Sequence, residues 1–167
     1  MRDETDGLLA AWARERPDLD VAPLAVLSRV TRLARHLDRE RRAAFAEHGL
    51  EGYEFDVLAA LRRAGDPYEL TPGQLLHETL VGSGTMTNRL DRMEARGLVS
   101  RRRDPDDGRG VRVRLTAAGR DRTDAAVADL LDRERVLLAA LPDADRDRLA
   151  QLLRSVLGNF EGRLSDG

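Results

Sequence analysis

Residues 70–115 restrict the fold more than any other part of the sequence, because they predict two short helices followed directly by two short strands. The helices are expected over 70–81 and about 83–96, where apolar residues recur at helical spacing. The strands are expected over 98–103 and 111–115, and the second, VRVRL, alternates apolar residues with Arg. A helix–turn–helix followed directly by a two-stranded hairpin is a winged helix.

The residues at the ends of these elements support the same reading. The first helix has Thr71 as N-cap, Pro72 at its first position and Gln74 three residues after the cap, which is a capping box. Gly97 ends the second helix. The segment DPDDGRG (104–110) is rich in Asp, Pro and Gly and predicts the turn between the strands.

Helices are predicted for most of the remaining chain, at 7–16, about 24–47, 53–65, about 116–141 and the segment after Pro142. We therefore expect a mostly α fold with a small β-wing, formed by one domain over 1–167. Its expected parts are a winged helix-turn-helix lobe at about 53–115, dimerisation helices at about 22–48 and 117–164, and an N-terminal extension helix at about 7–16.

The dimerisation helices are inferred from apolar stripes at 24–47 and 143–164, which lie outside the winged-helix lobe. A second copy of the chain could cover both stripes, and a two-fold protein matches two half-sites one DNA turn apart. Packing of the two helices against each other within one chain remains the alternative.

Charge is distributed unevenly along the chain. All 28 basic residues are Arg, and the formal net charge is −2, which alone argues against a general nucleic-acid binder. Residues 83–114, however, hold nine of the Arg and only five of the 30 acidic residues. A positive segment on an acidic body steers a polyanion to one face.

The helix at 83–96 combines a packed face with a face of small polar groups. Met86, Leu90 and Met93 cluster on one side, whereas Asn88 and Arg92 lie opposite them. Helices that enter the major groove read bases from their N-terminal turns, and Asn can pair with an adenine edge. We expect these residues of the lobe to contact DNA: Thr71, Gln74, Ser83, Thr85, Thr87, Asn88, Arg92, Arg102 and Arg109.

Arginines extend the predicted interface into the hairpin. Arg101, Arg102 and Arg103 are placed to supply phosphate contacts. Arg109 stands between two glycines at the tip of the turn, where a single Arg suits a narrow minor groove. The alternative is a solvated charged helix beside an arginine-rich hairpin, and the capped helix before it and the glycine-tipped turn after it favour DNA.

With these motifs in view, the chain resembles the MarR family of transcriptional regulators over roughly residues 20–164. The segments that carry the resemblance are EFDVLAALRRAG (54–65), LTPGQLL (70–76), GTMTNRLDRMEARGLVSRR (84–102) and DPDDGRGVRVRLTAAG (104–119). The last matches the family's wing pattern from Asp107 to Thr116, except that Gly108 stands where family members often have a basic residue.

The resemblance implies a homodimer, joined through its N- and C-terminal helices, that binds a pseudo-palindromic operator in double-stranded DNA. It also implies a repressor that releases DNA when a small aromatic or anionic effector binds. A winged-helix module that binds DNA constitutively, or one that contacts other proteins without a ligand, is the alternative.

Four residues resemble those of the urate-responsive branch of the family: Trp12, Asp56, Arg89 and Arg101. Asp56 is the only acid in FDVLAAL, so it is expected to be buried and paired, and Arg89 lies where it could turn inward to it. Arg101, at the start of the wing, could reach the same region. In that branch the equivalent residues are implicated in binding a planar anionic purine. The alternative is that Trp12 packs in the protein and that Asp56 and Arg89 form a structural pair.

Other classes of protein find little support. The three histidines at 36, 48 and 77 form no two-histidine metal motif, and the chain has no Cys, so neither a metal nor a cofactor is expected. The segment VGSGTMT (81–87) lacks the lysine of a phosphate-binding loop and follows a helix, which argues against an enzyme of that kind. No run of about 18 apolar residues and no secretory signal are found, and a cytoplasmic location is expected.

Overall fold

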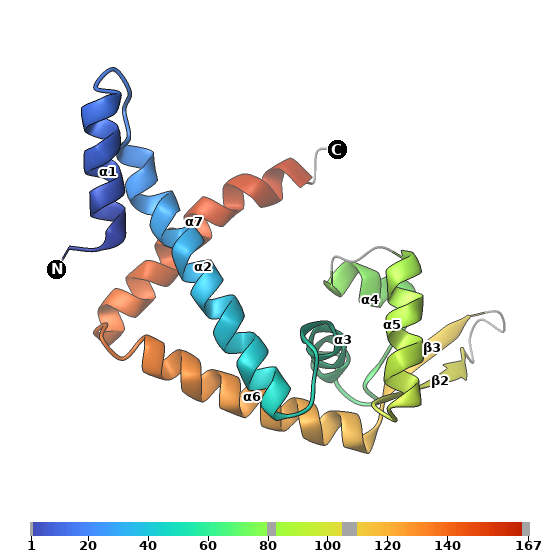
Figure 1. The fold of residues 1–167 in the computed structure, drawn as a ribbon. Coiled ribbons are helices and arrows are strands. Elements are labelled where there is room, and N and C mark those ends of the chain that lie inside the picture. The colour runs from blue at the N-terminus through green and yellow to red at the C-terminus, as the bar shows by residue number, and fades with distance from the viewer. Residues whose placement is uncertain (1, 80–82, 105–109, 165–167) are drawn as a thin grey trace. The chain divides into compact units, whose positions relative to one another are not determined.

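The computed structural model describes residues 2–79, 83–104 and 110–164, with side chains up to residue 159 apart from that of Ser83 (Figure 1). The chain divides into two compact units, residues 1–127 and 128–167. Its elements are α1 (Glu4–Glu15), α2 (Ala22–Glu47), α3 (Gly52–Arg63), β1 (Glu69–Leu70), α4 (Pro72–Thr79), α5 (Ser83–Ala95), β2 (Val99–Arg103), β3 (Val111–Leu115), α6 (Ala117–Leu137) and α7 (Asp143–Leu164). The expected mostly α fold with a small β-wing is confirmed.

Helix α1 begins three residues earlier than the sequence predicts because Asp3 caps it. The Asp3 carboxylate accepts hydrogen bonds from the backbone N–H groups of Thr5 and Asp6, at 2.9 and 3.1 Å. Asp3 and Asp6 also bind Arg29 of α2, through contacts of 2.7–3.0 Å. The same carboxylate therefore starts α1 and attaches it to α2.

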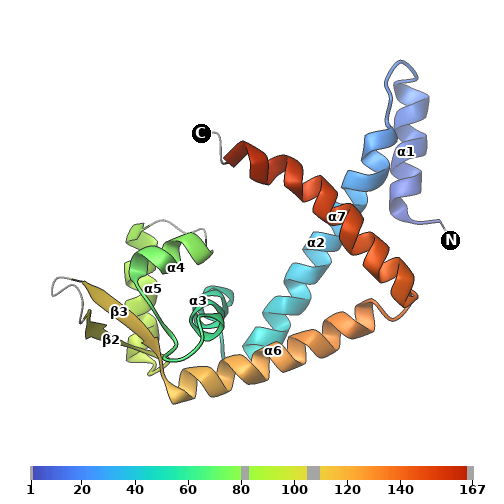
Figure 2. The ribbon, with the colours of Figure 1, turned by 180° about the vertical axis from the view of Figure 1, so that it is seen from behind.

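The core of the first unit is built around α3. Both views place this helix between the C-terminal end of α2 and the α4–α5 pair (Figure 1, Figure 2). The fully buried apolar side chains come from several elements and include Leu58, Leu61, Leu75, Met86, Met93, Leu98 and Val113. Burying each of these contributes roughly 1.5–3 kcal/mol relative to exposure, so their packing holds the short helices in place.

A third strand, β1, joins the predicted hairpin. The antiparallel sheet has the order β1-β3-β2, with Leu70 opposite Val113 and Arg101 opposite Val113 on the other side. The sequence does not predict β1, because two residues are too few to show alternation.

Helix α6 begins where Thr116 caps it and ends four residues before the predicted position. The Thr116 hydroxyl accepts from the Gly119 N–H at 3.0 Å and donates to the Gly97 carbonyl at 2.7 Å. After Leu137 the chain forms tighter i→i−3 turns, such as Leu141 N–H to Leu138 carbonyl at 3.0 Å. Pro142 follows, and α7 starts at Asp143.

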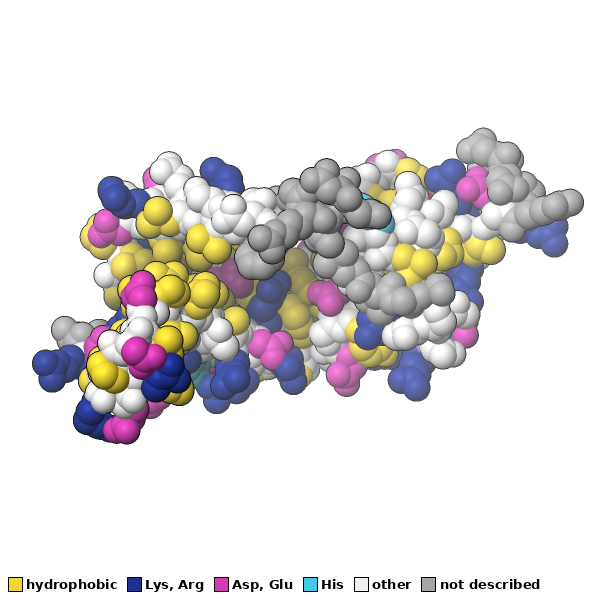
Figure 3. Space-filling view, turned by 90° about the horizontal axis from the view of Figure 1, so that it is seen from above, with side chains coloured by type: hydrophobic (Ala, Val, Ile, Leu, Met, Phe, Trp, Pro, Cys, Tyr) yellow, Lys and Arg dark blue, Asp and Glu magenta, His cyan; other side chains and the backbone are white. Residues whose placement is uncertain are grey.

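Large apolar side chains remain exposed in both units of the single chain. In the first unit they lie mainly on α2, where Val26, Leu27 and Leu33 are each at least half exposed. In the second unit Val136 is 74% exposed, and Leu152 and Leu157 of α7 are each 56% exposed. Figure 3 shows one face on which hydrophobic side chains gather at the surface. None of the described helices is long and apolar enough to cross a membrane.

Gly119 provides a direct test of how α6 joins the sheet. A Cβ at this position would overlap the Leu98 carbonyl oxygen and approach a Leu115 methyl group to 3.0 Å. We expect Gly119→Ala to lower the free energy of unfolding by at least about 2 kcal/mol, because backbone must move to admit the methyl group. Urea unfolding at fixed protein concentration measures the change.

Gly7→Ala in α1 is the matched control, since a Cβ there meets no atom within 4 Å. It should leave the stability unchanged or raise it by up to about 1 kcal/mol. Equal stability of the wild type and Gly119→Ala would show that α6 does not approach β2 as closely as described.

Candidate nucleic-acid interface and adjoining cavity

Helix α5 presents the polar face that the sequence predicts. Met86, Leu90 and Met93 are buried against the core. Thr85, Thr87, Asn88 and Arg92 are exposed on the other side. Ser83 is the first residue of the helix, and its side chain lies outside the described part of the structure. The exposed groups are free of core packing, so they can meet a groove of DNA.

The N-terminus of α4 carries the predicted capping box. The Thr71 N–H donates to Gln74 Oε1 at 2.8 Å, and the Gln74 N–H donates to Thr71 Oγ1 at 3.2 Å. Gln74 is exposed and Thr71 is half-buried. Both side chains thus fix the start of α4, and their contact with DNA stays a prediction.

Two arginines of the sheet, Arg102 and Arg112, are bound by acidic side chains. Arg102 donates to both oxygens of Glu69 at 2.8 and 2.6 Å. Arg112 donates to Asp104 at 2.9 Å. The Arg102 guanidinium is the main cause of a lowered Glu69 pKa, so this carboxylate stays ionised well into acid. Arg109 of the predicted turn lies outside the described residues.

Arg101 is turned toward α5. Its Nη1 lies 2.6 Å from Asp91 Oδ1, and its backbone N–H donates to Glu94 at 2.9 Å. It joins β2 to α5, and it is not among the residues that line the cavity described below, where Asp56 lies. The sequence-based expectation that Arg101 reaches the region of Asp56 is therefore not met in this structure.

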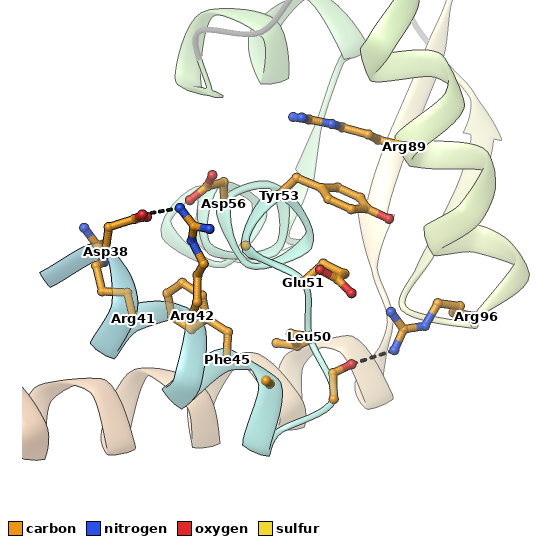
Figure 4. A pocket seen from close by; sticks show the side chains of 13 residues that line it. Asp38, Arg41, Arg42, Phe45, Leu50, Glu51, Tyr53, Asp56, Arg89 and Arg96 are labelled. Atoms are coloured by element: carbon orange, nitrogen blue, oxygen red, sulfur yellow. Dashed lines mark hydrogen bonds and ion pairs between the residues drawn. The ribbon is translucent and has the colours of Figure 1, made fainter. Parts of the chain in front are cut away.

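A cavity of about 860 Å³ opens between α2, α3 and α5 (Figure 4). Its walls include Arg41 of α2, Tyr53 and Asp56 of α3, and Arg89 of α5. The Arg89 guanidinium lies over the Tyr53 ring, 4.9 Å from its centroid. The cavity thus brings cations, a carboxyl group and a flat aromatic face together.

Asp56 is exposed in the single chain and lies in the cavity wall, which corrects the expectation of a fully buried acid. Partial burial raises the pKa of its carboxyl group, and the charges of Arg41, Arg89 and Arg63 oppose this shift. Asp56 and Arg89 therefore share the cavity. Trp12 is 44% exposed on α1 and does not line it.

The buried acid of α3 is Glu54, which the sequence analysis does not select. No part of it is exposed, and both carboxylate oxygens accept hydrogen bonds from Arg96. One oxygen also accepts the Glu51 N–H at 2.9 Å, and Arg96 donates to the Gly49 carbonyl at 2.6 Å. Glu54 shares its i, i+4, i+7 stripe with Leu58 and Leu61, and that spacing could have identified it as the inward acid.

This pair joins three segments next to the cavity. Arg96 directly follows α5, Glu54 lies in the first turn of α3, and Gly49 belongs to the loop after α2. Arg96 and Gly49 also contribute to the cavity wall (Figure 4). The end of α5 is therefore fixed by contacts of Arg96 and Gly49, two residues that an occupant of the cavity would meet. Within the described residues no group of three or more His, Asp or Glu is placed to hold a metal ion.

Comparisons with known proteins agree with this geometry. A model of the MarR family matches residues 48–110. The HTH-type transcriptional regulator PecS of Dickeya dadantii is 34% identical over 161 residues, covering 96% of this chain and 95% of PecS. The HTH-type transcriptional repressor NicR of Pseudomonas putida is 29% identical, covering 86% of this chain and 91% of NicR.

Among solved structures, a MarR mutant from E. coli complexed with operator DNA is 27% identical to this chain, with a TM-score of 0.68. The match covers 83% of this chain and 99% of that one. The chain is therefore similar to these regulators over most of its length in both sequence and fold.

The Glu54–Arg96 pair leads to a test of stability. We expect Arg96→Met to lower the free energy of unfolding by about 3 kcal/mol, because it leaves the buried Glu54 carboxylate without its cation. Arg63→Met is the control, since Arg63 binds Glu78 at 3.1 Å with both side chains exposed, and the loss should stay within about 1 kcal/mol. Equal losses in urea unfolding would contradict a special role for Arg96.

Proposed function

This chain belongs to the MarR family of transcriptional regulators, and we propose that it binds a pseudo-palindromic DNA operator as a homodimer and represses transcription from it. The observation that carries the proposal is the exposed face of Thr85, Thr87 and Asn88 on a helix whose other side is buried. Small side chains let the helix backbone come close to base edges, and an Asn amide can pair with adenine.

The surroundings of α5 support this mode of binding. In winged helices of this arrangement one helix enters the major groove while the hairpin holds the backbone beside it. The similar E. coli MarR mutant was solved in complex with operator DNA. By this analogy, Arg92 of α5 and Arg102 of β2 would contact phosphates, and Arg109 would reach the minor groove.

A second copy of the chain accounts for the exposed apolar residues of α2 and α7. Side chains such as Val26, Leu33 and Leu157 are half exposed or more in one chain. Association would remove them from water at about 25 cal/mol per Å². Two copies related by a two-fold axis would present two α5 helices to successive turns of DNA.

We further propose that a small anionic, aromatic effector such as urate occupies the cavity and releases DNA. Arg41 and Arg89 would hold its negative charge, Asp56 would accept its N–H groups, and the Tyr53 ring provides a flat surface. Arg89 belongs to α5, so a ligand that binds it acts directly on the helix that reads DNA. Trp12 and Arg101, the other two residues of the urate-like set, lie elsewhere in the described chain.

Asn88 tests the recognition half of the proposal. The DNA that flanks the gene for this protein is the natural source of an operator, and fluorescence anisotropy measures its binding. We expect Asn88→Ala to weaken operator binding by about 1–3 kcal/mol while leaving binding to unrelated duplex nearly unchanged. Glu15→Ala, which truncates an exposed side chain of α1 outside the lobe and the proposed dimerisation helices, is the control.

A wild-type protein that ignores duplex DNA even at about 50 mM salt would overturn the proposal, because phosphate contacts are strongest there. An Asn88→Ala protein that binds the operator as tightly as the wild type would show that α5 does not read it as described.

Titration of urate against the bound operator tests the effector half. Urate should dissociate the wild-type complex, and Arg89→Gln should raise the urate concentration needed by at least about 10-fold, since a charge-assisted contact is lost. Arg63→Gln is the control, because Arg63 lies near Asp56 but does not line the cavity. If urate and related acids leave the wild-type complex intact, the effector proposal fails while the DNA-binding proposal stands.

A further inference from the structure

Glu69 occupies an unusual position for an acid in a DNA-binding lobe. It forms half of the two-residue strand β1 and lies opposite Arg114 of β3. Only 4% of its side chain is exposed. Its two oxygens accept from Nε and Nη2 of Arg102 at 2.8 and 2.6 Å, and Arg114 Nε lies 3.7 Å away. One carboxylate therefore faces two of the arginines on this sheet.

The register of the sheet places these groups on one face. Arg102 is opposite Arg112, and Ser100 is opposite Arg114. Side chains of directly opposed residues point to the same side of a sheet, and residues two apart along a strand share that side. Glu69, Arg102, Arg112 and Arg114 thus form one outer face. Arg112 on this face is bound to Asp104.

The geometry of the Arg102 pair matters for phosphate binding. A guanidinium binds a carboxylate or a phosphate through the same pair of parallel N–H groups. In this structure Glu69 occupies the Nε–Nη2 edge of Arg102. A DNA phosphate that binds this edge of Arg102 must therefore displace the carboxylate.

We propose that Glu69 is an internal competitor of DNA, which holds back the phosphate affinity of the hairpin by occupying Arg102. The proposal rests on the proposed DNA-binding function and adds a residue that opposes it. The carboxylate remains ionised across the neutral range because the adjacent Arg102 lowers its pKa. The restraint is therefore present whenever the protein meets DNA near neutral pH.

Glu69→Gln tests the proposal, since the substitution keeps the shape of the side chain and removes its charge. Affinity for a duplex of unrelated sequence should rise by about 3- to 10-fold at about 0.1 M salt. The slope of log affinity against log salt concentration should become steeper by about 1, because one more phosphate is neutralised. Unchanged or weaker binding with an unchanged slope would overturn the proposal and would identify Glu69 as a stabilising partner of the sheet only.

A second arm tests whether the effect passes through Arg102. In an Arg102→Gln background, Glu69→Gln should raise duplex affinity by clearly less than it does in the wild type. An equal gain in both backgrounds would exclude competition for Arg102. Thermal melting of each variant checks that it is folded, and Glu69→Asp keeps the charge as a further comparison.

Asp124→Asn is the matched control for loss of a negative charge. Asp124 binds Arg62 through two hydrogen bonds of 2.8 and 3.3 Å, between α6 and α3. Its removal should change duplex affinity by less than about 2-fold, since that pair is not part of the sheet face. A wild type that does not bind duplex DNA in dilute buffer would instead overturn the proposed function and this inference with it.

Discussion

The buried carboxylate of Glu54 is the constraint on which the placement of helix α5 depends. An ionised group with no exposed surface costs several kcal/mol unless it is paired, and Arg96 and the Glu51 N–H meet that requirement. Because Arg96 follows α5 immediately, its pairing with Glu54 fixes the end of α5 against α3. The same arginine holds the Gly49 carbonyl, so the loop after α2 is included in this arrangement. The contacts of Arg96 therefore fix the end of α5 and also form part of the cavity wall.

A second feature is the extent to which arginines of the lobe are bound to acids. Arg101 contacts Asp91, Arg102 contacts Glu69, and Arg112 contacts Asp104. A sequence count of positive charge therefore overstates what the sheet can offer to phosphates. Under the proposed function, such pairing would limit binding that depends on charge alone and would leave more of the sequence discrimination to the small polar face of α5. Weak charge-based binding by the sheet together with sequence discrimination by α5 would suit a regulator that must find one site among many.

Much of the fold can be predicted from the sequence, because capping residues and apolar periodicity within short segments determine most of its helices and strands. The capping box at Thr71, the stripe of Met86, Leu90 and Met93, and the alternation in VRVRL each predict an element that the structure contains. The family resemblance, which rests on these same segments, is confirmed by relatives that match nearly the whole chain. The short strand β1 is missed because pairing with β3, and not its own pattern, defines it.

The site is harder to predict, because it depends on which way individual side chains turn. Asp56 stands out in an apolar segment, yet the helical phase of α3 places Glu54 inside and Asp56 at the cavity wall. The sequence suggests that Arg101 could reach Asp56, but in the structure Arg101 pairs with two acids of α5, Asp91 and Glu94. Ion pairs of this kind depend on distances between elements in the folded chain, and the spacing of residues in the sequence does not determine those distances. Asp56 and Arg89 line the same cavity, and their part in binding a ligand stays a prediction.

The close approach at Gly119 has a mechanical consequence. There is no room for a single methyl group between the first turn of α6 and the Leu98 carbonyl, so the two stretches of backbone approach each other directly at this junction. A closer approach would bring backbone atoms into overlap. A residue with any side chain at position 119 would therefore have to move the start of α6 away from the segment that leads into β2.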